Sequence, residues 1–143
     1  ESIGTNAKMN EMEAAMGLCV LDEIGVIKTE RQRIWQMYQQ ELSDLVQFQQ
    51  WNANSQNNYA YAPVLFESEA KLLAVEAKLK ENNILPRRYF HPSLDTLDYL
   101  QSTQNCELSR DVADRILCLP IYSGLDGKSQ EQIIANIREI SNG

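Results

Sequence analysis

The sequence predicts a domain of the α/β class, of the mixed α+β kind: a small sheet of roughly three strands with helices on one face, and a long N-terminal helix pair. Two patterns support this. Apolar residues recur at helical spacing through 1–47, and strand-like and helical segments alternate from residue 58 onward. At 143 residues and 43% hydrophobic content, the chain can bury one core. We therefore expect a single domain over 1–143, with connecting helices in 1–47 and a sheet domain in 58–143.

Two helices are predicted in the N-terminal third. Asn10 and Glu13 match a capping box, so a helix should begin near Glu11. Gly25 permits a bend, and a second, longer helix follows from Val26. Its apolar residues recur at the spacing of one helix face, at Ile27, Ile34, Met37, Tyr38, Leu42 and Leu45. A long helix of this kind is suited to joining one domain to another.

A strand, a helix and a second strand are predicted next. Residues 59–66 are aromatic and branched, and Pro63 among them indicates an edge strand or a bulge. Ser68 can cap the following helix, which should end near residue 82. The inward positions of this helix are Leu72, Val75 and Leu79. Residues 84–90 are then expected to form the second strand.

The C-terminal third predicts a short helix over 109–117, a third strand over 118–122 and a last helix. Gly124 suits a turn with positive φ between the strand and that helix. Ser129, with Gln132 three residues later, is the predicted cap. The apolar face of the last helix consists of Ile133, Ile134, Ile137 and Ile140.

Charge and composition exclude several classes of function. A net charge of -7 and a pI near 4.7 argue against binding to nucleic acid or to anionic lipid, which require clustered Lys and Arg. The three cysteines lack metal-ligand spacing, and their odd number suggests reduced thiols in a cytosolic protein. No apolar stretch approaches the roughly 20 residues of a membrane span. We expect a cytoplasmic protein without a metal site, a nucleic-acid partner or a membrane partner.

Asn6 and Lys8 precede the first predicted helix and form the first candidate site. An amide, an ammonium group and a helix N-terminus together suit a phosphate, because the helix end supplies backbone N–H groups and a partial positive charge. The alternative is that Asn6 only makes a turn and that Lys8 is solvated. The residues alone leave both open.

The second candidate site lies in residues 85–94, where arginines, aromatic residues and the single histidine gather at the end of a predicted strand. Arginine offers a planar fork to phosphate, and an aromatic face can stack on a base or a sugar. Arg88, Tyr89 and His91 are the candidates for substrate binding. For His91 the alternative is a turn residue beside Pro92, without an acid–base role.

Three segments carry a resemblance to a known family. The opening run 4–17, with Asn6, Lys8 and the small-residue helix, resembles a stretch of the DegT-type (DegT/DnrJ/StrS) nucleotide-sugar aminotransferases. The 85–94 segment and residues 106–125 resemble later parts of the same family, in the same order. The resemblance implies the C-terminal domain of an enzyme of fold type I that depends on pyridoxal 5'-phosphate (PLP).

The resemblance also implies roles for the candidate residues. Asn6 matches an asparagine that reaches across a dimer interface to the phosphate of the neighbouring subunit's PLP, and Lys8 stands where the family usually has arginine. Arg88, Tyr89 and His91 match a segment near the nucleotide-sugar. The lysine that holds PLP lies outside this chain, so the chain alone should bind no PLP and have no activity.

The implied reaction of the intact homodimer moves an amino group from glutamate to a nucleotide-linked keto-deoxysugar, of the dTDP-keto-6-deoxyhexose type, for surface-polysaccharide or glycan synthesis. Two alternatives stay open. One is a non-catalytic interaction module whose long helix pairs with a partner. The other is a family member that dehydrates or senses a sugar.

Overall fold

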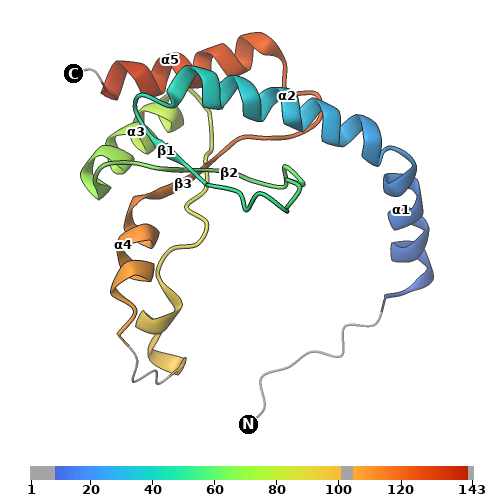
Figure 1. The fold of residues 1–143 in the computed structure, drawn as a ribbon, viewed down its shortest axis with the longest axis horizontal. Coiled ribbons are helices and arrows are strands. Elements are labelled where there is room, and N and C mark those ends of the chain that lie inside the picture. The colour runs from blue at the N-terminus through green and yellow to red at the C-terminus, as the bar shows by residue number, and fades with distance from the viewer. Residues whose placement is uncertain (1–8, 101–104, 142–143) are drawn as a thin grey trace.

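The computed structural model describes residues 9–100 and 105–141. Within them the chain forms helices around a three-stranded sheet (Figure 1). The α-helices are α1 (Glu11–Asp22), α2 (Ile24–Leu42), α3 (Glu69–Glu81), α4 (Glu107–Arg115) and α5 (Gly127–Ser141). The strands are β1 (Gln47–Phe48), β2 (Ala62–Leu65) and β3 (Ile116–Leu119). Short 3-10 helices cover Leu94–Thr96 and Asp98–Leu100.

The sheet is antiparallel with the strand order β1-β2-β3. Strand β2 is central: Val64 faces Phe48 on one side and Leu117 on the other. Pro63 therefore lies in the central strand, which corrects the expected edge position. The proline is tolerated because β1 reaches only as far as Val64, so no strand lies beside Pro63 on that side.

The core lies between the sheet and the helices α2, α3 and α5 (Figure 1). Ala62, Val64 and Phe66 alternate inward from β2 and its end, as the two-residue period of a strand requires. The helical residues of the core include Ile34, Tyr38, Leu42, Leu72, Val75, Leu79, Ile133 and Ile137. The predicted mixed fold, with helices covering one face of a small sheet, is confirmed.

Helix α1 begins where its cap predicts but buries none of its residues. The Asn10 side chain accepts from the Glu13 backbone N–H at 2.9 Å, and the Glu13 carboxylate accepts from the Asn10 N–H at 2.9 Å. The helix projects from the body and contacts α2 (Figure 1). Its exposed apolar residues include Met12, Met16, Leu18, Val20 and Leu21. Such a face is normally covered by another element.

The predicted strand at 84–90 is wrong. The segment makes a single β-bridge, in which Arg87 and Cys118 exchange backbone hydrogen bonds of 3.2 and 2.8 Å. In this register Leu85 would face Pro120, which has no N–H to donate, and the Tyr89 N–H turns back to the Arg87 carbonyl. The third strand of the sheet is instead β1, only two residues long, which carries no clear period in the sequence.

Two further boundaries differ from the predictions. Strand β3 covers Ile116–Leu119 and so begins before residue 118, directly after α4. The cap of α5 is Asp126, whose carboxylate accepts from the backbone N–H and the hydroxyl of Ser129 at 2.9 and 2.6 Å. Ser129 lies inside the helix. Gly124 has the predicted positive φ, at 89°.

No described helix combines the length and the apolar content that crossing a membrane would require.

Candidate functional site

The predicted site residues fall into two groups. Asn6 and Lys8 lie outside the described residues. Arg88, Tyr89 and His91 lie in the segment 84–94, which runs from the end of α3 past the edge of β3 and on toward α4. The structure brings these three residues together along the segment, with different surroundings for each.

Arg88 points into the molecule. Its Nη2 donates to Glu69 Oε1 at 3.0 Å and to the Asp114 carbonyl at 2.9 Å, and it lies 3.5 Å from the Ala113 carbonyl. Only 16% of its side chain is exposed. These bonds tie the 84–94 segment to the start of α3 and the end of α4, so Arg88 anchors the segment.

His91 belongs to the same ionic cluster. Its Nε2 lies 3.5 Å from Asp114 Oδ1, and one ligand atom from each of Glu69, His91 and Asp114 falls within 4.8 Å of the others. A histidine and two carboxylates at this spacing are a donor set for a divalent cation. The Arg88 guanidinium pairs with Glu69, however, so two side-chain pairs, Arg88 with Glu69 and His91 with Asp114, lie next to each other here.

Tyr89 faces the opposite way from Arg88 and lies among aromatic rings. Its ring packs edge-on against Tyr61, with centroids 5.8 Å apart, and stacks with Phe90 at 5.1 Å. The Arg87 guanidinium lies 5.5 Å from the centroid of the Tyr89 ring and donates to its hydroxyl. Neighbouring residues alternate in direction, so Arg87 is exposed while Arg88 is not.

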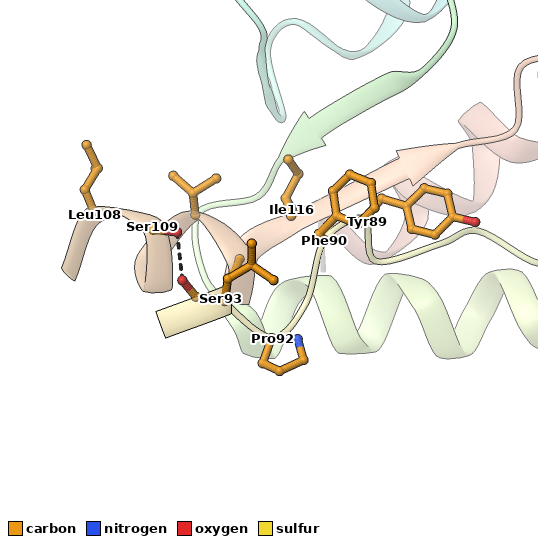
Figure 2. Close-up of a pocket in the computed structure, with 10 residues that line it drawn as sticks. Tyr89, Phe90, Pro92, Ser93, Leu108, Ser109 and Ile116 are labelled. Carbon is orange, nitrogen blue, oxygen red and sulfur yellow. Dashed lines mark hydrogen bonds between the residues drawn. The ribbon is translucent and has the colours of Figure 1, made fainter. Parts of the chain in front are cut away.

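A large open pocket of about 970 Å³ lies between the 84–94 segment and α4 (Figure 2). Its lining is mainly apolar, with Phe90, Pro92, Leu108 and Ile116 around it. The hydroxyls of Ser93 and Ser109 join its two sides at 2.7 Å, as the dashed line in Figure 2 shows. The pocket suits an apolar surface better than a highly charged group.

A smaller groove of about 300 Å³, the β3 groove, lies at the end of β3, between the residues that precede β2 and the 84–94 segment. Its lining includes Tyr61, Arg87, Tyr89, Cys118 and Tyr122. Burial raises the pKa of the Cys118 thiol, so this cysteine stays protonated and is not a nucleophile.

Asp95 organises the rim of the large pocket, although no pattern in the sequence pointed to it. Its carboxylate accepts from the Ser93 hydroxyl at 2.6 Å, the Cys106 N–H at 3.0 Å and Arg110 Nε at 2.8 Å. The Ser93 bond, the Cys106 N–H and Arg110 lower the pKa of Asp95. A single aspartate is ordinary in sequence, and Cys106 and Arg110 lie 11 and 15 positions further along the chain.

Solved structures share this fold. One is a DegT DnrJ EryC1 StrS aminotransferase from Brucella abortus, with a TM-score of 0.84 and 23% identity over 99% of this chain and 38% of that one. Another is DesI, solved in the presence of its TDP-sugar product, with a TM-score of 0.84 and 28% identity over 96% of this chain and 37% of that one. The fold is thus that of the C-terminal part of DegT-type aminotransferases.

The chain belongs to the DegT/DnrJ/EryC1/StrS aminotransferase family, whose sequence profile matches residues 1–138. The family is PLP-dependent, and the resemblance inferred from the motifs is confirmed.

Two curated relatives are similar in sequence over nearly the whole chain. Both are named dTDP-4-amino-4,6-dideoxy-D-glucose transaminase. The protein of Shigella dysenteriae is 35% identical over 96% of this chain, and that of Escherichia coli is 33% identical over 98%. The chain spans about 40% of the length of these relatives.

Proposed function

We propose that this chain is the C-terminal part of a PLP-dependent aminotransferase that moves an amino group from glutamate to carbon 4 of a dTDP-linked keto-6-deoxyhexose. The observation that carries the proposal is the 35% identity, over 96% of the chain, to the transaminase of Shigella dysenteriae. Membership of the family supports the reaction class. The sugar and the carbon rest on the names of the relatives.

The two pockets described above offer no amine to PLP. No lysine lines the large pocket or the β3 groove as described. Lys78 and Lys80 pair with Glu139 and Glu76, and Lys71 donates to the Ser141 carbonyl. PLP requires an amine that forms an imine with it. We therefore place that lysine in the part of the protein that the relatives have and this chain lacks; when bound, PLP supplies the electron sink for amino transfer.

The chain's own contribution is then twofold. Asn6 and Lys8 would complete the phosphate site of a partner subunit in a homodimer, next to the start of α1. Tyr89 and His91 would face the substrate, with Arg88 holding their segment to α3 and α4 through Glu69 and Asp114. The uncovered apolar face of α1 supports a position against another part of the enzyme.

One observation also favours a non-catalytic interaction module: an exposed apolar helix is what such a module would offer to a partner. A module of this kind would never bind PLP. A sugar dehydratase or sensor of the same family would yield no amino sugar. One set of measurements separates these cases.

The full open reading frame that contains this chain is expressed with PLP, and its visible absorption is recorded before and after glutamate is added. We expect a band of lysine-bound cofactor that disappears with glutamate, and an amino sugar by mass spectrometry when the dTDP-linked 4-keto-6-deoxyglucose is supplied. Asn6→Ala should weaken PLP retention on dialysis. Absence of the band with excess PLP would favour the interaction module, and a band without amino sugar would exclude the proposed substrate.

A further inference from the structure

Three side chains of the kinds that bind metal ions meet at one point of the surface. Glu69 begins α3, His91 lies on the 84–94 segment, and Asp114 lies near the end of α4. One oxygen or nitrogen atom from each falls within 4.8 Å of the other two. Spacing along the chain does not reveal such a set, because its members come from three separate segments.

The distances in this cluster suit a metal ion better than a hydrogen bond. His91 Nε2 and Asp114 Oδ1 are 3.5 Å apart, longer than an ordinary N–H···O bond of about 2.7–3.2 Å. Around a tetrahedral zinc ion with bonds of about 2.1 Å, neighbouring ligand atoms lie roughly 3.4 Å apart. The long Glu69 side chain can close the remaining distance by rotation about its own bonds.

The charges at the cluster also favour a cation. Glu69 and Asp114 contribute two negative charges and Arg88 one positive charge, which leaves one negative charge beside a neutral imidazole. Arg88 donates to Glu69 Oε1, and a carboxylate can accept this bond with one oxygen while the other binds a metal. The Arg88 bond of 2.9 Å to the Asp114 carbonyl holds the 84–94 segment against α4 independently of Glu69.

The cluster is open to water. The side chains of Glu69, His91 and Asp114 are 45%, 32% and 51% exposed. A cation can therefore enter without any opening of the fold. Water can complete its coordination, as it does in zinc sites that have three protein ligands.

We propose that Glu69, His91 and Asp114 bind a divalent transition metal of the zinc type, with His91 coordinating through Nε2. An imidazole together with carboxylates suits such a metal better than calcium or magnesium, which prefer oxygen ligands alone. Coordination through Nε2 leaves Nδ1 available for the substrate contact proposed above. The metal joins α3, the 84–94 segment and α4, and its binding does not depend on the proposed function.

The test measures Zn²⁺ binding by calorimetry to the full-length protein, supplied with PLP and prepared without a polyhistidine tag. His91→Ala, Asp114→Asn and Glu69→Gln should each weaken the binding of one zinc ion per subunit. The loss should be at least the roughly tenfold that removal of an outer-shell partner costs a metal site. The three side chains are partly exposed, so the variants should keep the fold, which circular dichroism checks. A large excess of Ca²⁺ should not displace the zinc.

Asp98→Asn is the matched control, since Asp98 is an exposed carboxylate outside the cluster. It should leave zinc binding unchanged. Equal zinc affinities for the unaltered protein and His91→Ala would overturn the inference, as would ready displacement of the zinc by Ca²⁺ or no zinc binding to the unaltered protein. The proposed function is judged separately by the cofactor band and its response to glutamate, a step that involves no zinc.

Discussion

Two adjacent arginines, Arg87 and Arg88, show how strongly the role of a residue depends on the direction in which its side chain points. Arg88 is enclosed by a carboxylate and backbone carbonyls, whereas Arg87 projects into the β3 groove beside Tyr89. The Tyr89 N–H bonds back to the Arg87 carbonyl, so the backbone turns at Arg88 and the two arginine side chains meet different surroundings. The sequence alone predicted substrate contacts for Arg88, Tyr89 and His91, and none for Arg87.

The pair yields a matched prediction on stability. Arg88→Ala leaves Glu69 and the Asp114 carbonyl without their donor, and should lower the free energy of unfolding by about 2 kcal/mol. Arg87→Ala removes an exposed side chain and should change it by less than about 0.5 kcal/mol. Urea unfolding at pH 7 measures both. Equal effects for the two variants would contradict an anchoring role for Arg88.

Asp95 yields a prediction on pH. Its pKa is lowered in the folded chain by Ser93, the Cys106 N–H and Arg110, so its ionised form stabilises the fold at pH values above the unfolded pKa of about 3.9. This contribution is lost as the pH falls through the folded pKa. Asp95→Asn should be less stable than the unaltered chain at pH 7, and the difference should shrink below about pH 4. Ser93→Ala, which removes one of the bonds, should show a smaller change of the same sign. The free energy of unfolding is measured by urea denaturation between pH 7 and pH 3. A constant difference between Asp95→Asn and the unaltered chain over this range would contradict the stabilising role of ionised Asp95.

At the scale of elements, helices are predictable where a cap marks their start. The pairs Asn10 with Glu13, and Ser68 with the Lys71 N–H, form as the sequence indicates. Short strands are not predictable in this way. Strand β1 has only two residues, and its pairing with β2 is decided by the packing of the chain around it. Residues 84–90 have strand-like composition, but Pro120 opposite Leu85 and the turn at Tyr89 limit them to one bridge.

Loss of the α1 cap should destabilise that helix alone, whereas loss of the α3 cap should destabilise the whole fold. Asn10→Ala costs about 1 kcal/mol of helix stability, and because α1 buries no residue, the loss should stay local. Amide exchange across Glu11–Asp22 should speed up about fivefold, with the global urea midpoint unchanged. Ser68→Ala, at the cap of α3, should instead lower global stability by about 1 kcal/mol, because Leu72 and Val75 of that helix are in the core. A global shift from Asn10→Ala would show that α1 is coupled to the core.

At the scale of the whole molecule, the described residues combine an apolar core with one helix, α1, whose apolar residues no other described element buries. The apolar cluster joins β2 and β3 to α2, α3 and α5, while the apolar residues of α1 remain exposed. The chain spans about 40% of the length of its curated relatives. In proteins of that length, the remaining residues are available to cover a helix such as α1.

The exposed helix leads to a prediction about association. The chain by itself should bind the dye ANS and self-associate at high concentration, because Met12 and Met16 are 74% and 67% exposed. The double variant Met12→Glu with Met16→Lys places an ion pair at helical spacing and should reduce both effects while keeping the helix. Leu73→Lys, an exposed change on α3, is the control and should reduce neither. Sedimentation velocity measures self-association, and ANS fluorescence measures dye binding. If the double variant behaved like the unaltered chain in both, the surface responsible would not be the apolar face of α1.

The sequence by itself determined what depends on local chemistry: the capped starts of α1 and α3, the apolar faces that build the core, the positive φ of Gly124, and the motifs that mark the family. The tertiary structure alone decided what depends on distant partners. It placed Arg88 against Glu69 and α4, and brought Cys106 and Arg110 to Asp95. It also set the tyrosines beside Arg87. The physical reason is that caps and periodicity act within a few residues, whereas a binding surface forms between segments that only folding brings together.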